Sequence, residues 1–163
     1  MVKGLHVPAD TRAPITEREF VRLEDYQAGV GGYIEHVDIP LLKITLVANE
    51  EGLLRGLEFN PRATFLWWYH VVEARQQAML VGDIVIVGWP DRSGEATDVA
   101  DELLALFTKG GKFAIQIQRA GESEWVDHGV TYDDYFQALV WGMVLVKHVG
   151  PCEIKVVGSI NDD

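Results

Sequence analysis

The feature that most limits the possible folds is a strand–strand–helix–strand pattern near the C-terminal end of the sequence. Residues 113–118 alternate between apolar and polar side chains, and an extended pattern resumes at 125–130 after a turn at 120–123, which predicts a β-hairpin. Residues 153–157 predict a closing strand. Between hairpin and strand runs an apolar stripe at helical spacing, which consists of Tyr132, Tyr135, Phe136, Leu139, Met143 and Val146. Such a β-β-α-β unit excludes an all-helical fold and favours antiparallel pairing.

Helices and short strands also alternate through the first half of the sequence. Thr16 followed by Glu19 has the spacing of a capping box, which predicts that a helix begins at Thr16. Asn60 followed by Pro61 predicts another helix over residues 61–80, because Asn accepts hydrogen bonds from free amides and Pro lacks an amide that would be unpaired there. The remaining patterns predict extended segments at 33–38, 43–48, 55–59 and 83–88.

Two further helix starts are predicted in the second half. Thr97 or Asp98 would cap a helix that ends at Gly110, and Thr131 would cap the helix with the apolar stripe. The complete pattern predicts an α+β protein with a mixed or antiparallel sheet and about four helices. Its second half would be a helix followed by the β-β-α-β unit.

A turn-rich segment at 89–94 divides the sequence. Pro fixes φ, and Asp, Ser and Gly favour turns, so this segment predicts a boundary between residues 1–90 and 91–163. The first part contains 12 acidic and 8 basic side chains, and the second contains 13 and 6. The acidic excess is therefore larger in the second part. The sequence leaves open whether both parts pack as one globular unit.

The composition narrows the class of protein. With 25 acidic and 14 basic residues, the formal net charge is −11, which repels phosphate backbones, so we expect no direct binding of nucleic acid. The single cysteine, Cys152, excludes an internal disulfide and a multi-cysteine zinc site, and it favours a reducing compartment. No apolar run is long enough to span a membrane, and the first residues do not resemble a signal peptide. We therefore expect a cytoplasmic protein that does not act at membranes.

The sequence shows no familiar catalytic motif. The glycine-rich residues 29–32 follow a predicted helix and precede a strand, which is the reverse of the order found in phosphate-binding loops. Glu50 and Glu51 lie on a predicted turn, where adjacent carboxylates diverge. The residues therefore predict no catalytic site, no cofactor and no metal, and they favour a protein that is not an enzyme.

His36 and Asp38 come nearest to a reactive cluster. Residues two apart in a strand share a face, so both side chains would project from the same side of the sheet. Two ligands do not complete a metal site. A third would have to come from one of three distant residues: His6, His70 or Asp83. His36, Asp38 and Glu50 together support the hypothesis that the protein is an enzyme. This hypothesis ranks below the hypothesis of a binding protein.

Residues 65–70 form the densest aromatic run in a chain with five tryptophans. Successive residues of a helix point about 100° apart, so the run cannot all face one core. Part of it therefore predicts an exposed surface for a partner, formed by Trp67, Trp68 and Tyr69. The alternative is a helix packed between two layers, which would bury the same rings.

Several motifs are shared, in order and spacing, with a known family. They are GGYIE at 31–35, LVANEEG at 46–52, Gly56-Leu57, NPRA at 60–63 and VGDIVIVG at 81–88. On these motifs residues 2–88 resemble the uncharacterised family called domain of unknown function 3846, which occurs mainly in bacteriophages, including those of actinobacteria, and in mobile elements. The resemblance implies a phage or mobile-element accessory protein in a bacterial cytoplasm.

The family has no established catalytic residues, but the resemblance points to positions at which a shared ligand site would lie. These are Tyr33, Asn49, Glu50, Asn60 and Arg62. The residues also have a structural explanation, because Asn49 suits a turn before Gly52, and Asn60 with Pro61 suits a helix start. Both explanations stay open at the level of sequence.

Three functional hypotheses follow. The first is an accessory protein that binds a host or phage protein without catalysis, with a homodimer left open. The second is a module that sequesters a nucleotide or signalling molecule, using aromatic rings for stacking and Arg55, Arg62 or Arg75 for phosphate. A site between the two parts of the chain is left open. A special case of the first is an acidic mimic of nucleic acid that inhibits a host defence protein or another DNA-binding protein, and the enzyme hypothesis ranks third.

Overall fold

The computed structural model describes residues 1–161, and its chain divides into two compact units, Met1–Leu104 and Ala105–Asp163. Within the described residues it contains four α-helices, an antiparallel sheet of five strands and another of three. The predicted α+β class is therefore confirmed. The division after Leu104 falls later in the chain than the turn-rich segment at 89–94, and the boundary expected there stays a prediction.

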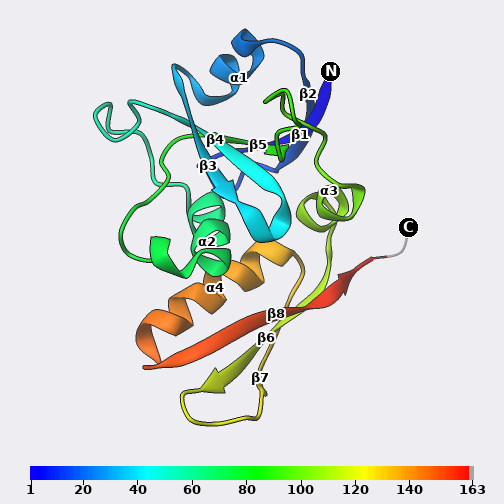
Figure 1. Ribbon diagram of the computed structural model, residues 1–163. Coiled ribbons are helices and arrows are strands. Elements are labelled where there is room, and N and C mark those ends of the chain that lie inside the picture. Colours follow the sequence, from blue (N-terminus) through cyan, green and yellow to red (C-terminus); the bar gives the residue numbers. More distant parts are fainter. Residues whose placement is uncertain (162–163) are drawn as a thin grey trace. The chain divides into compact units, whose positions relative to one another are not determined.

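The first unit is built on the five-stranded sheet, whose strand order is β2-β1-β5-β4-β3 (Figure 1). Its strands are β1 (Val2–Val7), β2 (Thr16–Phe20), β3 (Ile34–Ile39), β4 (Ile44–Asn49) and β5 (Ile84–Gly88). Its helical segments are α1 (Leu23–Val30), α2 (Pro61–His70) and the 3-10 turns η1 (Pro40–Leu42) and η2 (Val72–Ala74), and α3 (Asp101–Thr108) begins in this unit. In Figure 1, α1 lies above the strands and α2 lies below them.

One face of this sheet packs against α1. Phe20, Val47, Val85 and Val87 form a buried cluster on this face together with Val30 of the helix. Gly29 allows the close approach, because a Cβ atom there would lie 2.7 Å from a methyl group of Val85. The absence of a side chain at this position therefore lets α1 rest directly on β5.

The opposite face contains the other half of the alternating apolar residues. Leu5 pairs with Ile86, and Ile86 pairs with Leu46, so these three side chains share one face. All three are fully buried. Burial on both faces explains why β5 is apolar along its whole length and β4 along most of it. The continuous apolar run predicted β5 as a strand, whereas alternation in residues 43–48 predicted β4.

The second unit contains the predicted β-β-α-β pattern. Its elements are β6 (Gly111–Arg119), β7 (Val126–Tyr132), α4 (Tyr135–His148) and β8 (Cys152–Ile160). The strands pair in the order β7-β6-β8, and Gly142 of α4 lies against Ile115 and Ile154 of the sheet. Within residues 1–161, no helix combines the length and the apolar composition that crossing a membrane requires.

The helix predicted to begin at Thr16 is wrong, because residues 16–20 form strand β2. Backbone pairing with β1 outweighs the local capping-box pattern. The helix begins later, at Leu23, where the carboxylate of Asp25 accepts hydrogen bonds from the amides of Val21 and Arg22 at 2.7 and 2.9 Å. Those two amides lower the pKa of Asp25, so its charged form supports the helix start.

The helix predicted over residues 61–80 starts correctly at Pro61 but ends at His70. Val71 is extended, with φ −126° and ψ 90°, and a Val-Val pair is a weak continuation of a helix. The chain then folds back, and the hydroxyl of Thr64 both donates to the carbonyl of Leu80 and accepts from its amide. These long-range hydrogen bonds replace the last turns of the predicted helix.

The predicted caps in the second half are also corrected. The hydroxyl of Thr97 donates to the carbonyl of Trp89, and the carboxylate of Asp98 accepts from the amide of Lys3, so neither caps α3. Thr131 lies in strand β7, and Asp134 caps α4 through the amide of Gln137. The extended piece at 55–59 is reduced to turns and one bridge from Phe59 to Val81.

Candidate functional site

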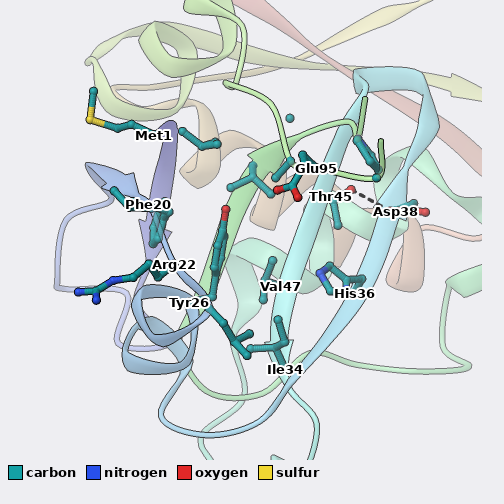
Figure 2. A pocket seen from close by; sticks show the side chains of 18 residues that line it. Met1, Phe20, Arg22, Tyr26, Ile34, His36, Asp38, Thr45, Val47 and Glu95 are labelled. Carbon is teal, nitrogen blue, oxygen red and sulfur yellow. Dashed lines mark hydrogen bonds between the residues drawn. The ribbon is translucent and has the colours of Figure 1, made fainter. Parts of the chain in front are cut away.

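A cavity of about 670 Å³ opens on the α1 side of the five-stranded sheet, and all of the residues that line it belong to the first unit (Figure 2). Its floor is the sheet, where Thr45, Val47, Val87 and Gly88 are buried. One wall is α1 with the residues before it, and the other is the segment after β5. Chain segments far apart in sequence therefore meet around one space.

Strand register determines which side chains reach the cavity. Asp38 pairs with Thr45, and Thr45 pairs with Val87, so these three form one row across the sheet. The next row contains His36 and Val47. Since side chains alternate between faces, both rows point to the α1 side, and the outer ends of both rows lie on the edge strand β3.

The polar end of the floor is a hydrogen-bonded pair. The hydroxyl of Thr45 donates to Oδ1 of Asp38 at 2.9 Å. Thr45 is buried, whereas Asp38 and His36 are exposed at the rim. The pair holds the Asp38 carboxylate in place while leaving its second oxygen able to accept hydrogen bonds.

Tyr26 forms the wall on the helix side. Its ring stacks on Phe20, with centroids 5.0 Å apart and an interplanar angle of 17°. Burial, and then the nearby carboxylates of Glu95 and Asp25, raise the pKa of the Tyr26 hydroxyl. The hydroxyl therefore keeps its proton at neutral pH and can donate a hydrogen bond.

The second wall is a loop organised by Asp91. Its Oδ1 atom accepts hydrogen bonds from the Ser93 hydroxyl at 2.6 Å and from the amides of Ser93 and Glu95 at 2.9 and 3.0 Å. The Ser93 hydroxyl contributes most to lowering the pKa of Asp91, and the Glu95 amide comes next. The loop thus presents Glu95 at the cavity from a defined backbone conformation (Figure 2).

His6 lies on the same face of the sheet, one strand beyond Val85, but does not line the cavity. Its Nε2 atom is 3.1 Å from Oδ2 of Asp83, whose other oxygen accepts from the amide of Ala9. Burial and the charge of Arg18 lower the pKa of His6, and these effects outweigh the raising effect of Asp83. The imidazole is therefore neutral in the folded protein at pH 7.

We expect the free energy of unfolding to fall as the pH is lowered through about 6.5, the ordinary His pKa of an unfolded chain. Below that pH the unfolded chain binds a proton that folded His6 resists, so acid favours unfolding. His70, whose pKa is lowered by burial, acts in the same direction. Denaturant titrations at pH 7 and pH 5 measure the effect, and His6→Gln should make the pH dependence shallower. An equal slope in His6→Gln and in the exposed control His128→Gln would contradict this assignment.

The predicted common face of His36 and Asp38 is present in the structure, and both residues line the cavity. The other candidate residues of that hypothesis lie elsewhere. His6 and Asp83 pair with each other, and Glu50 is exposed after the end of β4. Across residues 1–161 no group of three His, Cys, Asp or Glu side chains is placed to hold a metal ion.

The residues suggested by the family resemblance do not line this cavity. Asn49 is buried, donates to the carbonyl of Val30 and accepts from the amide of Glu51. Asn60 caps α2, and Arg62 donates to the carbonyls of Pro8 and Asp10. Tyr33 and Glu50 are exposed and meet through a backbone hydrogen bond. A ligand role for these five residues stays a prediction.

The predicted partner surface on α2 is half-buried. The indole N–H of Trp68 donates to the carbonyl of Ala78, and its ring lies edge-on to Phe65. Trp67 and Tyr69 are also partly covered, and the Tyr69 ring lies edge-on to His70. These internal contacts explain part of the aromatic run as packing, while its role in binding a partner protein stays a prediction.

Sequence patterns did not identify Tyr26, Thr45 or Glu95 as residues of a site. Only Thr45 gave a usable signal, since a hydroxyl within the apolar run of a central strand needs a partner when buried. Tyr26 and Glu95 reach the cavity through the placement of α1 and of the loop after β5. That placement depends on long-range packing.

The structure defines an α+β protein whose five-stranded antiparallel sheet carries an open cavity of ligand size. The family model described as Domain of unknown function (DUF3846) matches residues 2–112, which is more than half of the chain. The chain therefore belongs to this family, and the match extends beyond the residues that carried the resemblance. No curated protein and no solved structure matches the chain.

Proposed function

We propose that this protein binds a small organic molecule in the cavity on its five-stranded sheet. The observation that carries the proposal is the cavity itself. Its volume of about 670 Å³ lies within the range of small-molecule sites, and its buried apolar floor is bordered by a few polar groups. Binding there would sequester a nucleotide, a nucleoside or another signalling molecule of similar size.

The polar and aromatic groups around the cavity are already held in place, which supports binding. Phe20 stacks on Tyr26, Thr45 holds Asp38, and Asp91 organises the loop that carries Glu95. A ligand would therefore meet ordered side chains, and less conformational entropy would be lost on binding than at a flexible surface. The phage or mobile-element setting implied by the resemblance suits a protein that removes a host molecule from the bacterial cytoplasm.

The proposal is tested by a ligand screen on the intact chain and on two matched variants. Native mass spectrometry of the purified protein would detect a retained ligand, and a thermal-shift screen would cover nucleosides, nucleotides and cyclic oligonucleotides. A ligand present at about 100 times its dissociation constant should add about 2.7 kcal/mol to the free energy of unfolding.

His36→Trp places a large ring at the cavity rim and should reduce the affinity at least about tenfold, which corresponds to about 1.4 kcal/mol. Glu35→Trp is the matched control, because Glu35 is the adjacent exposed residue on the opposite face of β3. Equal binding by both variants would show that the ligand does not use this cavity. A screen without any hit would leave the protein-partner hypothesis as the stronger proposal.

A further inference from the structure

We call the space between Tyr26 and His36, two aromatic side chains that line the cavity, the slot. Figure 2 shows Tyr26 and His36 on opposite sides of Val47, with the ring nitrogen of His36 turned toward the space between them. Val47 and Val87 provide a buried apolar floor. The exposed fractions of the two valines are 0% and 2%, so a ligand would lie above the side chains that cover them. A planar group between Tyr26 and His36 would meet an aromatic ring on each side, an arrangement that favours heteroaromatic ligands.

The far end of the slot consists largely of hydrogen-bond acceptors. The carboxylates of Asp38 and Glu95 border it from β3 and from the loop after β5 (Figure 2). The only hydroxyl proton of Thr45 is already donated to Asp38, so Thr45 offers only acceptor capacity to a ligand. The Tyr26 hydroxyl can donate a hydrogen bond near Glu95, but the acceptors of Asp38, Thr45 and Glu95 outnumber it, so a ligand placed here is selected for hydrogen-bond donors.

The cationic side chain among the lining residues, Arg22, does not point into the slot. Arg22 is one of the lining residues, but Figure 2 shows its guanidinium pointing away from the space between Tyr26 and His36. A phosphate group inside the slot would face Asp38 and Glu95 without this compensating charge. The electrostatics therefore disfavour phosphates at the acceptor end.

We propose, on the basis of the binding function above, that the ligand is a planar heteroaromatic molecule with an exocyclic amino group. The ring lies between Tyr26 and His36. The amino group donates to the carboxylates of Asp38 and Glu95, and any phosphate of the ligand extends away from them. The expected class thus includes nucleosides with an amino-bearing base.

Two pairs of nucleosides provide the test, because the members of each pair differ in one group. Adenosine and cytidine carry an amino group where purine riboside and pyrimidin-2-one riboside carry a hydrogen atom, and the ring nitrogens are acceptors in both members of each pair. Isothermal titration of the intact protein should show that each amino member binds about tenfold or more tightly than its partner, the effect of one hydrogen bond to a charged group. Equal or weaker binding of the amino members, or no binding of any nucleoside, would overturn the inference.

Two variants show whether Asp38 accepts a hydrogen bond from the amino group of the ligand. Asp38→Asn retains the size of the side chain and an acceptor for Thr45, but its amide can also donate, so the preference for amino members should shrink about tenfold. Glu35→Gln, on the opposite face of the same strand, should leave the preference unchanged. An equal loss of affinity for both members in Asp38→Asn would also overturn the inference.

Failure of the inference is distinguishable from failure of the proposed function. Tight binding of a nucleoside without an amino group or of another small molecule, abolished by His36→Trp, would retain the cavity as a binding site and reject the amino-group specificity. Ligands that bind the wild type and His36→Trp equally would reject the site itself.

Discussion

Replacing Asn60 with alanine should lower the free energy of unfolding by about 3 kcal/mol, because one buried side chain satisfies three backbone groups. Its oxygen accepts from the amide of Ala63 at the start of α2, and its amide donates to the carbonyls of Val7 and Gly82 at 3.0 and 2.9 Å. Asn60 is 0% exposed, so water cannot replace these hydrogen bonds without structural change. Urea denaturation followed by circular dichroism measures the loss.

Asn60→Ser separates the two roles of this residue. Serine can still cap α2 through the amide of Ala63, but it cannot reach both carbonyls, so we expect roughly half of the loss seen with alanine. Glu51→Ala, at an exposed turn position, is the control. A loss below about 1 kcal/mol in Asn60→Ala would contradict the importance of the buried hydrogen bonds and reopen the ligand role suggested by the family motifs.

Phe113→Ala should destabilise the second unit by about 4 kcal/mol, within the usual range for a buried Phe-to-Ala change. Phe113 is 2% exposed and lies edge-on to Tyr135 of α4, with ring centroids 5.9 Å apart. Its removal leaves a cavity between α4 and the three-stranded sheet. The second unit is small, so a loss of this size is a large part of the stability that such a unit can have.

Hydrogen exchange with mass spectrometry locates the effect of Phe113→Ala. Amides of β6 and β8 should lose their protection, because these strands pair along their whole length beside Phe113. Gln116→Ala is the matched control, since Gln116 is on the same strand but on the face away from α4. A similar loss of amide protection in both variants would show that the Phe113 ring does not stabilise the packing of α4 on the three-stranded sheet.

The parts of the fold that the sequence predicts correctly are those determined by local patterns. Alternation in β4 and β6 and the continuous apolar run of β5 identified strands, and Asn60-Pro61 identified the start of α2. The errors occur where distant segments compete with a local signal. Thr16–Phe20 pairs with β1 instead of starting a helix. The chain folds back after α2, and the hydroxyl of Thr64 donates to the carbonyl of Leu80.

The candidate site was less predictable than the fold. His36 and Asp38 were paired correctly by their period-2 spacing, because that spacing is a property of any strand. Tyr26 and Glu95 could not be found in this way, since they reach the cavity from a helix and a loop about 70 residues apart. The motif residues Asn49 and Asn60 make buried structural hydrogen bonds, and their predicted ligand role stays a prediction.

The extent of the family match has a consequence for how this protein can vary. Except for Met1, every residue that lines the cavity lies within residues 2–112, whereas most of the β-β-α-β unit lies beyond them. Relatives that share the matched segment are therefore expected to inherit the pocket, with rim positions such as 36, 38 and 95 setting what each relative accepts. Because most of the C-terminal unit lies outside the matched residues, we expect it to vary more among relatives than the sheet that carries the cavity.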